Sequence, residues 1–137
     1  MMTVQFRLTA SNDLTPRALA WLQVSLDKTP NNETALQEIL SRDGEFYLVV
    51  NEISSVTDEI PIGCIYLEWL PEILNIVLLG GDNIKPWRDD LHNFLVNLIR
   101  ERGITTIMFC GRYGIGKLFP QFKAIGTLYT YKDKGGG

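Results

Sequence analysis

The hydrophobic pattern of the first thirty residues predicts a strand followed by a helix. Val4 to Thr9 alternates branched or aromatic with polar side chains, which is typical of a strand with one buried face. Between Leu14 and Leu26 apolar residues recur every three or four positions, which predicts an amphipathic helix. Its N-cap is Asp13 or Thr15, and it ends near Lys28.

The middle of the chain changes from a helical to a strand pattern. A short helix is expected from Thr34, whose hydroxyl can form a capping box with Gln37, and it stops before Gly44. Three apolar strands follow, and the connections between them are too short for crossover helices, so they should form an antiparallel meander. These strands are Phe46 to Val50, Ile60 to Leu70 and Ile73 to Leu79.

The last fifty residues predict helix, strand, helix and strand. In order these are Pro86 to Arg102, Ile104 to Cys110, Gly111 to Gly126 and Thr127 to Tyr131. A β-branched strand that follows a long helix suggests a right-handed crossover, so Ile104 to Cys110 should lie parallel to the strand from Ile73.

Length and composition indicate one globular domain. The chain has 137 residues, of which 45% are hydrophobic and 21% charged, enough to bury one core. We expect a single domain over residues 1 to 134 and a disordered glycine tail over 135 to 137. No stretch is apolar enough to span a membrane, and the first residues lack the pattern of a secretory signal peptide.

The charge distribution argues against nucleic-acid binding but leaves a basic C-terminal end. The net charge is −3, whereas neutralising phosphates requires a basic face. Residues 1 to 111 carry 8 basic and 15 acidic side chains, and residues 112 to 137 carry 5 basic and 1 acidic. This end is a candidate contact surface for a protein partner, or the lysines merely solvate the last helix. The residues proposed for contact are Arg112, Tyr113, Lys117 and Lys123.

The cysteines and the single histidine do not form a recognisable site. Cys64 and Cys110 lie in apolar runs without a second ligand at metal-binding spacing, so we expect buried reduced thiols and no metal. His92 has no nucleophile at a motif spacing, which favours a packing or surface role.

The order of the elements resembles the GNAT superfamily of N-acetyltransferases. The residues that carry the likeness are the run from Gly111 to Gly114 and the run from Phe122 to Tyr129. Within that superfamily the chain resembles the short GNAT-like proteins of tailed bacteriophages, including small internal virion proteins. The resemblance implies an α/β fold with a twisted mixed β-sheet and helices on both faces.

The resemblance also places an acetyl-CoA signature at the start of the long helix, and this chain departs from it. GNAT enzymes hold the pyrophosphate there with a pattern of Arg or Gln, two residues, Gly, one residue, then Gly or Ala. Aligned on this helix, the two small positions fall on Asp89 and Leu91. The preceding pair Gly80 and Gly81 can still shape an anion-binding turn. The counter-charge would then come from Lys85 or Arg88.

The catalytic groups implied by the resemblance are also incomplete. The tyrosine that protonates the leaving thiolate would fall on Phe122, so Tyr113 is the substitute candidate. The third strand of the meander offers Asn75 but no carboxylate, which leaves Glu68 and Glu72, near the preceding turn, as candidate bases if the register allows.

These departures favour a non-catalytic function at the level of sequence. The leading interpretation is a degenerate, phage-type GNAT-fold protein that needs no cofactor and acts through protein contacts, in a virion or in the host cytoplasm. The alternative is an acetyl-CoA-dependent N-acyltransferase with an atypical cofactor-binding turn. The oligomeric state does not follow from the sequence.

Overall fold

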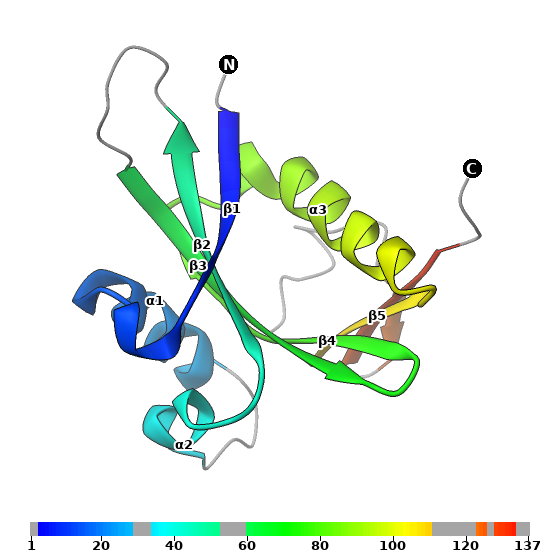
Figure 1. The fold of residues 1–137 in the computed structure, drawn as a ribbon, viewed down its shortest axis with the longest axis horizontal. Helices are drawn as coiled ribbons and strands as arrows, with labels where there is room; N and C mark the ends of the chain where they lie inside the picture. Colours follow the sequence, from blue (N-terminus) through cyan, green and yellow to red (C-terminus); the bar gives the residue numbers. More distant parts are fainter. Residues whose placement is uncertain (1–2, 29–33, 53–59, 111–122, 126–127, 134–137) are drawn as a thin grey trace.

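A computed structural model describes residues 3–28, 34–52, 60–110, 123–125 and 128–133. Figure 1 shows a single twisted sheet with helices packed against it. In chain order the elements are β1 (Thr3–Thr9), the 3₁₀ helix η1 (Ser11–Asp13), α1 (Pro16–Asp27), α2 (Leu36–Leu40), β2 (Glu45–Glu52), β3 (Ile60–Leu70), β4 (Ile73–Gly81), the 3₁₀ helix η2 (Lys85–Trp87), α3 (Arg88–Glu101), β5 (Thr106–Cys110), β6 (Lys123–Ile125) and β7 (Leu128–Lys132).

The sheet has the strand order β1-β2-β3-β4-β5-β7-β6. Strands β1 to β4 form the expected antiparallel meander. Strand β5 runs parallel to β4, and α3 connects the two, which confirms the predicted crossover. Strands β7 and β6 then continue the sheet in antiparallel pairing. The predicted α/β fold with a mixed sheet is therefore confirmed.

Two hydrophobic clusters cover the two faces of the sheet. Helices α1 and α2 pack on one face with Tyr66 and Leu78, and α3 packs on the other with Ile65 and Leu79. Successive side chains of a strand point to opposite faces, which is why neighbouring residues of β3 and β4 enter different clusters. Figure 1 shows α1 and α2 on one side of the sheet and α3 on the other.

The N-terminal helices agree with the sequence in position and differ in capping. Thr15 caps α1, because its hydroxyl oxygen accepts a hydrogen bond from the Ala18 amide at 3.2 Å. The predicted start of the second helix at Thr34 is wrong: α2 begins at Leu36, and its N-cap is Ala35, which makes no side-chain cap hydrogen bond. The Ala35 carbonyl accepts hydrogen bonds from the Glu38 and Ile39 amides, so the first turn of the helix closes on Ala35.

Three other boundaries shift. η2 precedes α3, so the α-helix starts at Arg88 and not at Pro86. β4 continues to Gly81, and β5 starts at Thr106. The helix predicted over Gly111 to Gly126 is wrong at Lys123–Ile125, which forms β6 because pairing with β7 overrides the local apolar spacing. The rest of that prediction, residues 111–122, lies outside the described residues.

No helix in the described part of the chain is long and apolar enough to cross a bilayer.

Candidate active site

The parallel strands β4 and β5 are paired only along their first residues and then separate in the middle of the sheet. They pair from Ile73 with Thr106 to Ile76 with Phe109, and β4 then continues to Gly81 without a β5 partner in this register. The pairing of β3 with β4 shifts at the same place, because Leu67 faces Ile76 while Tyr66 faces Leu78. Val77 is the extra residue of this β-bulge, which bends β4 where the two strands separate.

The N-terminus of α3 lies at the same end of the sheet as this opening. In a β–α–β crossover the helix starts where the first strand ends, and only Asp82 to Ile84 and the 3₁₀ helix η2 intervene here. Unpaired backbone amides and the helix dipole make such a terminus attractive to an anion. The separation of β4 from β5 and the start of α3 together form a candidate active site.

The side chains around the start of α3 carry balanced charge. Lys85 is exposed, and the Arg88 guanidinium lies 4.0 Å from the Asp89 carboxylate. Asp89 is itself exposed over 84% of its side chain, and Asp90 is also exposed. Leu91 is buried in the α3 cluster. Asp89 and Leu91, which replace the small residues of the GNAT pattern, therefore lie in the first turn of α3. Residues 82 to 87 connect β4 to this turn.

The two candidate glycines have a packing role. A Cβ on Gly80 would lie 2.7 Å from the Trp21 carbonyl carbon of α1, and a Cβ on Gly81 would lie 2.9 Å from the Gly63 Cα. Gly81 and Gly63 also contact the Trp87 ring, which is fully buried. Helix α1 and Trp87 thus clamp the end of β4 from its two faces, and glycine is required there for close approach.

Asp82, which the sequence did not single out, fixes the loop after β4. One carboxylate oxygen pairs with Arg17, and the other accepts a hydrogen bond from the Trp21 indole nitrogen at 3.1 Å. The Arg17 guanidinium also lies 5.0 Å from the centre of the Trp21 ring. These partners are more than sixty positions away in sequence, so only the folded chain brings them together.

Glu68 and Asn75 face each other across β3 and β4, one residue before β4 and β5 separate. Both lie on the face away from α3, because Leu74 and Ile76, the neighbours of Asn75, enter the α3 cluster. The Glu68 carboxylate accepts a hydrogen bond from the Tyr66 hydroxyl at 2.8 Å, and Arg42 approaches it at 3.7 Å. Burial, with the bond to Glu68, raises the pKa of Tyr66. Within the described part of the chain, the buried Asn75 Oδ1 has no hydrogen-bond partner.

The remaining candidates lie elsewhere. Glu72 occupies the β3–β4 turn, at the far end of β4 from the opening. Arg112, Tyr113 and Lys117 lie outside the described residues, and Lys123 is placed only as part of β6.

The two remaining reactive side-chain types have structural surroundings. Burial raises the pKa of the Cys64 thiol to about 12, so this cysteine is a core residue. His92 packs edge to face against Tyr131 with ring centres 4.8 Å apart. Among the described residues no group of histidine, cysteine and carboxylate side chains can hold a metal ion.

Solved structures share this fold over almost the whole chain. A domain from Methanocaldococcus jannaschii DSM 2661 aligns with a TM-score of 0.69 and 14% identity, covering 96% of this chain and 97% of that one. The PaiA N-acetyltransferase of Thermoplasma acidophilum, in complex with coenzyme A, aligns at 0.62 with 16% identity, covering 96% and 99%. A Bacillus subtilis acetyltransferase in complex with CoA aligns at 0.61 with 14% identity, covering 93% and 99%.

No protein-family model and no curated protein sequence matches the chain. The Thermoplasma acidophilum and Bacillus subtilis neighbours are acetyltransferases that align over almost their whole length, so the predicted resemblance is supported at the level of the fold. The chain has the GNAT-like α/β fold.

Proposed function

We propose that this protein is an N-acyltransferase that moves an acyl group from acetyl-CoA to an amine. The observation that carries the proposal is the separation of β4 from β5 beside the N-terminus of α3. The coenzyme A complexes of proteins with this fold also support it. The comparisons give the phage-type, non-catalytic interpretation no support.

The described residues fit acetyl-CoA at two places. Beyond Ile76, the edge of β4 that faces away from β3 is free of strand pairing within the described residues, so its amides and carbonyls can bond the amide-containing arm of the cofactor. At the start of α3, backbone amides with Lys85 and Arg88 can bind the pyrophosphate. These two cations offset the carboxylates of Asp89 and Asp90, which the sequence analysis counted against binding.

When bound, acetyl-CoA would supply the thioester that acylates the acceptor. The acceptor nitrogen forms a bond to the acyl carbon as the carbon–sulfur bond breaks, so the amine must lose a proton and the thiolate must gain one. The Glu68 carboxylate lies next to the opening, and we assign it the role of the general base that accepts the proton from the amine. The Tyr66 hydroxyl and Arg42 orient its carboxylate. Asn75, directly opposite, holds the acceptor in line.

The first test is binding of acetyl-CoA, measured by calorimetry and by thermal unfolding. We expect a dissociation constant between about 1 μM and 1 mM, and about 2.7 kcal/mol of stabilisation at 100 times that constant. The double variant Lys85→Glu, Arg88→Glu should weaken binding, whereas Lys28→Glu, a charge reversal at the far end of α1, should not. Absence of binding at about 1 mM acetyl-CoA would overturn the proposal.

The second test is catalysis, followed by release of the CoA thiol in the presence of primary amines. Glu68→Gln should lower kcat by about 10²-fold or more while acetyl-CoA binding is kept, because only the proton acceptor is removed. Glu38→Gln, on the exposed face of α2, is the matched control. Equal kcat for the two variants would remove Glu68 from the mechanism.

A further inference from the structure

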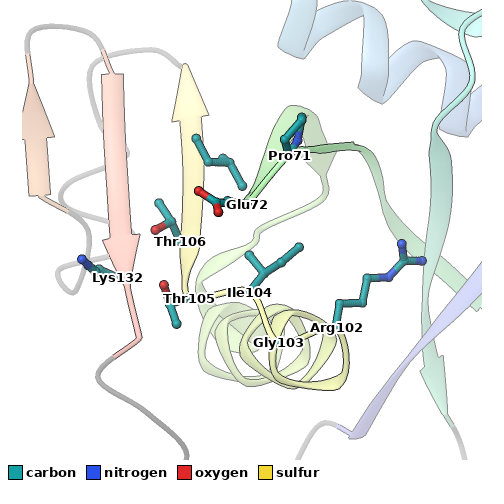
Figure 2. A pocket seen from close by; sticks show the side chains of 9 residues that line it. Pro71, Glu72, Arg102, Gly103, Ile104, Thr105, Thr106 and Lys132 are labelled. Atoms are coloured by element: carbon teal, nitrogen blue, oxygen red, sulfur yellow. The ribbon is translucent and has the colours of Figure 1, made fainter.

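A groove of about 680 Å³ opens between the β3–β4 turn and the start of β5. Figure 2 shows it with the side chains that line it. It includes Ile73 and Thr106, the first residues of β4 and β5. Because those strands are parallel, the groove lies at the opposite end of the pair from the candidate active site. Its lining residues are Pro71, Glu72, Ile73, Arg102, Gly103, Ile104, Thr105, Thr106 and Lys132.

Glu72 adopts a backbone conformation that glutamate rarely takes. Its φ is +64°, in the left-handed region, at the second position of the two-residue turn that joins β3 to β4. Turns of this kind favour glycine or asparagine there, because a longer side chain is strained. The carboxylate makes no hydrogen bond or ion pair with any residue of the described chain. Within the described residues, no cationic side chain therefore neutralises this exposed carboxylate.

One carboxylate, Glu72, and two cationic side chains, Arg102 and Lys132, line the groove, so their orientation decides which charge faces the open space. In Figure 2 the Glu72 carboxylate lies beside Thr106, with Thr105 further along the same wall. The Arg102 guanidinium points away and stacks on Trp69 at 3.9 Å, and the Lys132 ammonium also points away from Glu72. Helix α3 ends at the groove, so its last carbonyls add negative potential. A carboxylate, two hydroxyls and a helix C-terminus therefore line the open space, and the charged ends of Arg102 and Lys132 are turned away from it.

We propose that this groove binds a primary aliphatic amine. The ammonium is held by the Glu72 carboxylate and the threonine hydroxyls, which together supply acceptors for its three protons. The aliphatic chain lies on Pro71, Ile73 and Ile104, the apolar part of the lining. This site does not depend on acyl transfer, because it shares no side chain with the candidate active site.

The test is a titration of the full-length protein with n-butylamine hydrochloride, followed by amide NMR. Sodium butyrate, of the same chain length and opposite charge, is the matched ligand. A ligand of this size should bind with a dissociation constant of about 1 to 10 mM. We expect saturable shifts at Glu72, Thr105 and Thr106 with the amine and none with butyrate. Glu72→Gln, which keeps the length of the side chain, should weaken amine binding about tenfold or more.

Three results would overturn the proposal. Saturable binding of butyrate would mark the groove as an anion site built on Arg102 and Lys132. Unchanged amine affinity in Glu72→Gln would show that the carboxylate plays no part. Absence of saturable shifts up to about 50 mM amine would show that the groove binds no small amine. Because acetyl-CoA binding is measured separately, failure here leaves the proposed function untouched, and the reverse also holds.

Discussion

At the scale of single residues, the packing at the end of β4 depends on glycines, which have no side chain. Gly63 and Gly81 leave room for the buried Trp87 ring, and Gly80 leaves room for the backbone of α1. Trp87 precedes α3 directly, so its position fixes where that helix starts. The glycines therefore set the geometry of the candidate active site through packing.

Replacement of Gly63 tests this packing. A Cβ there would lie 2.9 Å from both the Trp87 ring and the Gly80 carbonyl oxygen, so Gly63→Ala should destabilise the protein by about 1–3 kcal/mol in urea unfolding. Gly103→Asn is the control: Gly103 has a φ of +68° and open space around it, and asparagine tolerates that conformation. Equal stability of the two variants would show that the ring adapts easily.

The backbone of Glu72 carries a second prediction at this scale. Glu72→Asn should raise the free energy of unfolding by about 0.5 kcal/mol, because asparagine is less strained at a positive φ. Glu72→Gln keeps the strain and should match the natural chain. A Tm for Glu72→Asn no higher than that of Glu72→Gln would mean that the turn holds glutamate without strain.

Sequence reasoning reached the residues whose partners are close along the chain. Thr15 is one of the two caps that the sequence predicts for α1, with Asp13, and its partner, Ala18, lies only three positions away. The contacts of Asp82 with Arg17 and Trp21 could not be predicted, since no local pattern connects residues so far apart. Glu68 was named as a conditional base, and its position opposite Asn75 depends on a strand register that the sequence alone did not fix.

At the scale of elements, an ion pair between the exposed Arg100 of α3 and the buried Asp133 ties the end of β7 to α3. Asp133, only 7% exposed, accepts bonds from the Arg100 Nε at 2.8 Å and Nη2 at 3.2 Å. Its amide donates to the Thr105 carbonyl just before β5. The predicted basic end of the chain thus contains a carboxylate that holds β7 in place, and Asp133 is structural.

Removal of that carboxylate should loosen β7 selectively. Asp133→Asn is expected to lower Tm by several degrees and to speed hydrogen exchange of the β7 amides more than those of β2, because the bidentate pair is lost. Asp43→Asn, at an exposed position, should change neither quantity. Uniform acceleration of exchange across the sheet would contradict a local role for this pair.

The elements that the sequence predicted well are those whose packing follows from a single period. The meander followed from apolar runs with short connections, and the crossover followed from the long helix between two apolar strands. The helix predicted at Lys123–Ile125 was wrong because three residues fit a helical spacing as well as a strand. Pairing with β7 decides between the two. Short segments take their conformation from partners, and long segments from their own pattern.

At the scale of the whole molecule, His92 gives stability a dependence on pH. Burial lowers its pKa below 6.5, against the opposite effects of Asp89 and Asp133. The unfolded chain therefore binds a proton more readily, so stability is full above the unfolded pKa and is lost as pH falls through the folded one. His92→Gln should lose less stability than the natural chain between about pH 7.5 and 5 in urea unfolding. Parallel losses in both proteins would show that other groups control the effect.

The short pairing of β4 with β5 makes the sheet easy to divide. Among the described residues, β4 and β5 share four strand-paired positions, Ile73 to Ile76 with Thr106 to Phe109, whereas β3 and β4 share eight. Such a seam is the natural boundary between two cooperative folding units. A molecule bound where the strands separate would contact both units at once. Its binding would therefore couple the two units, so that they unfold together.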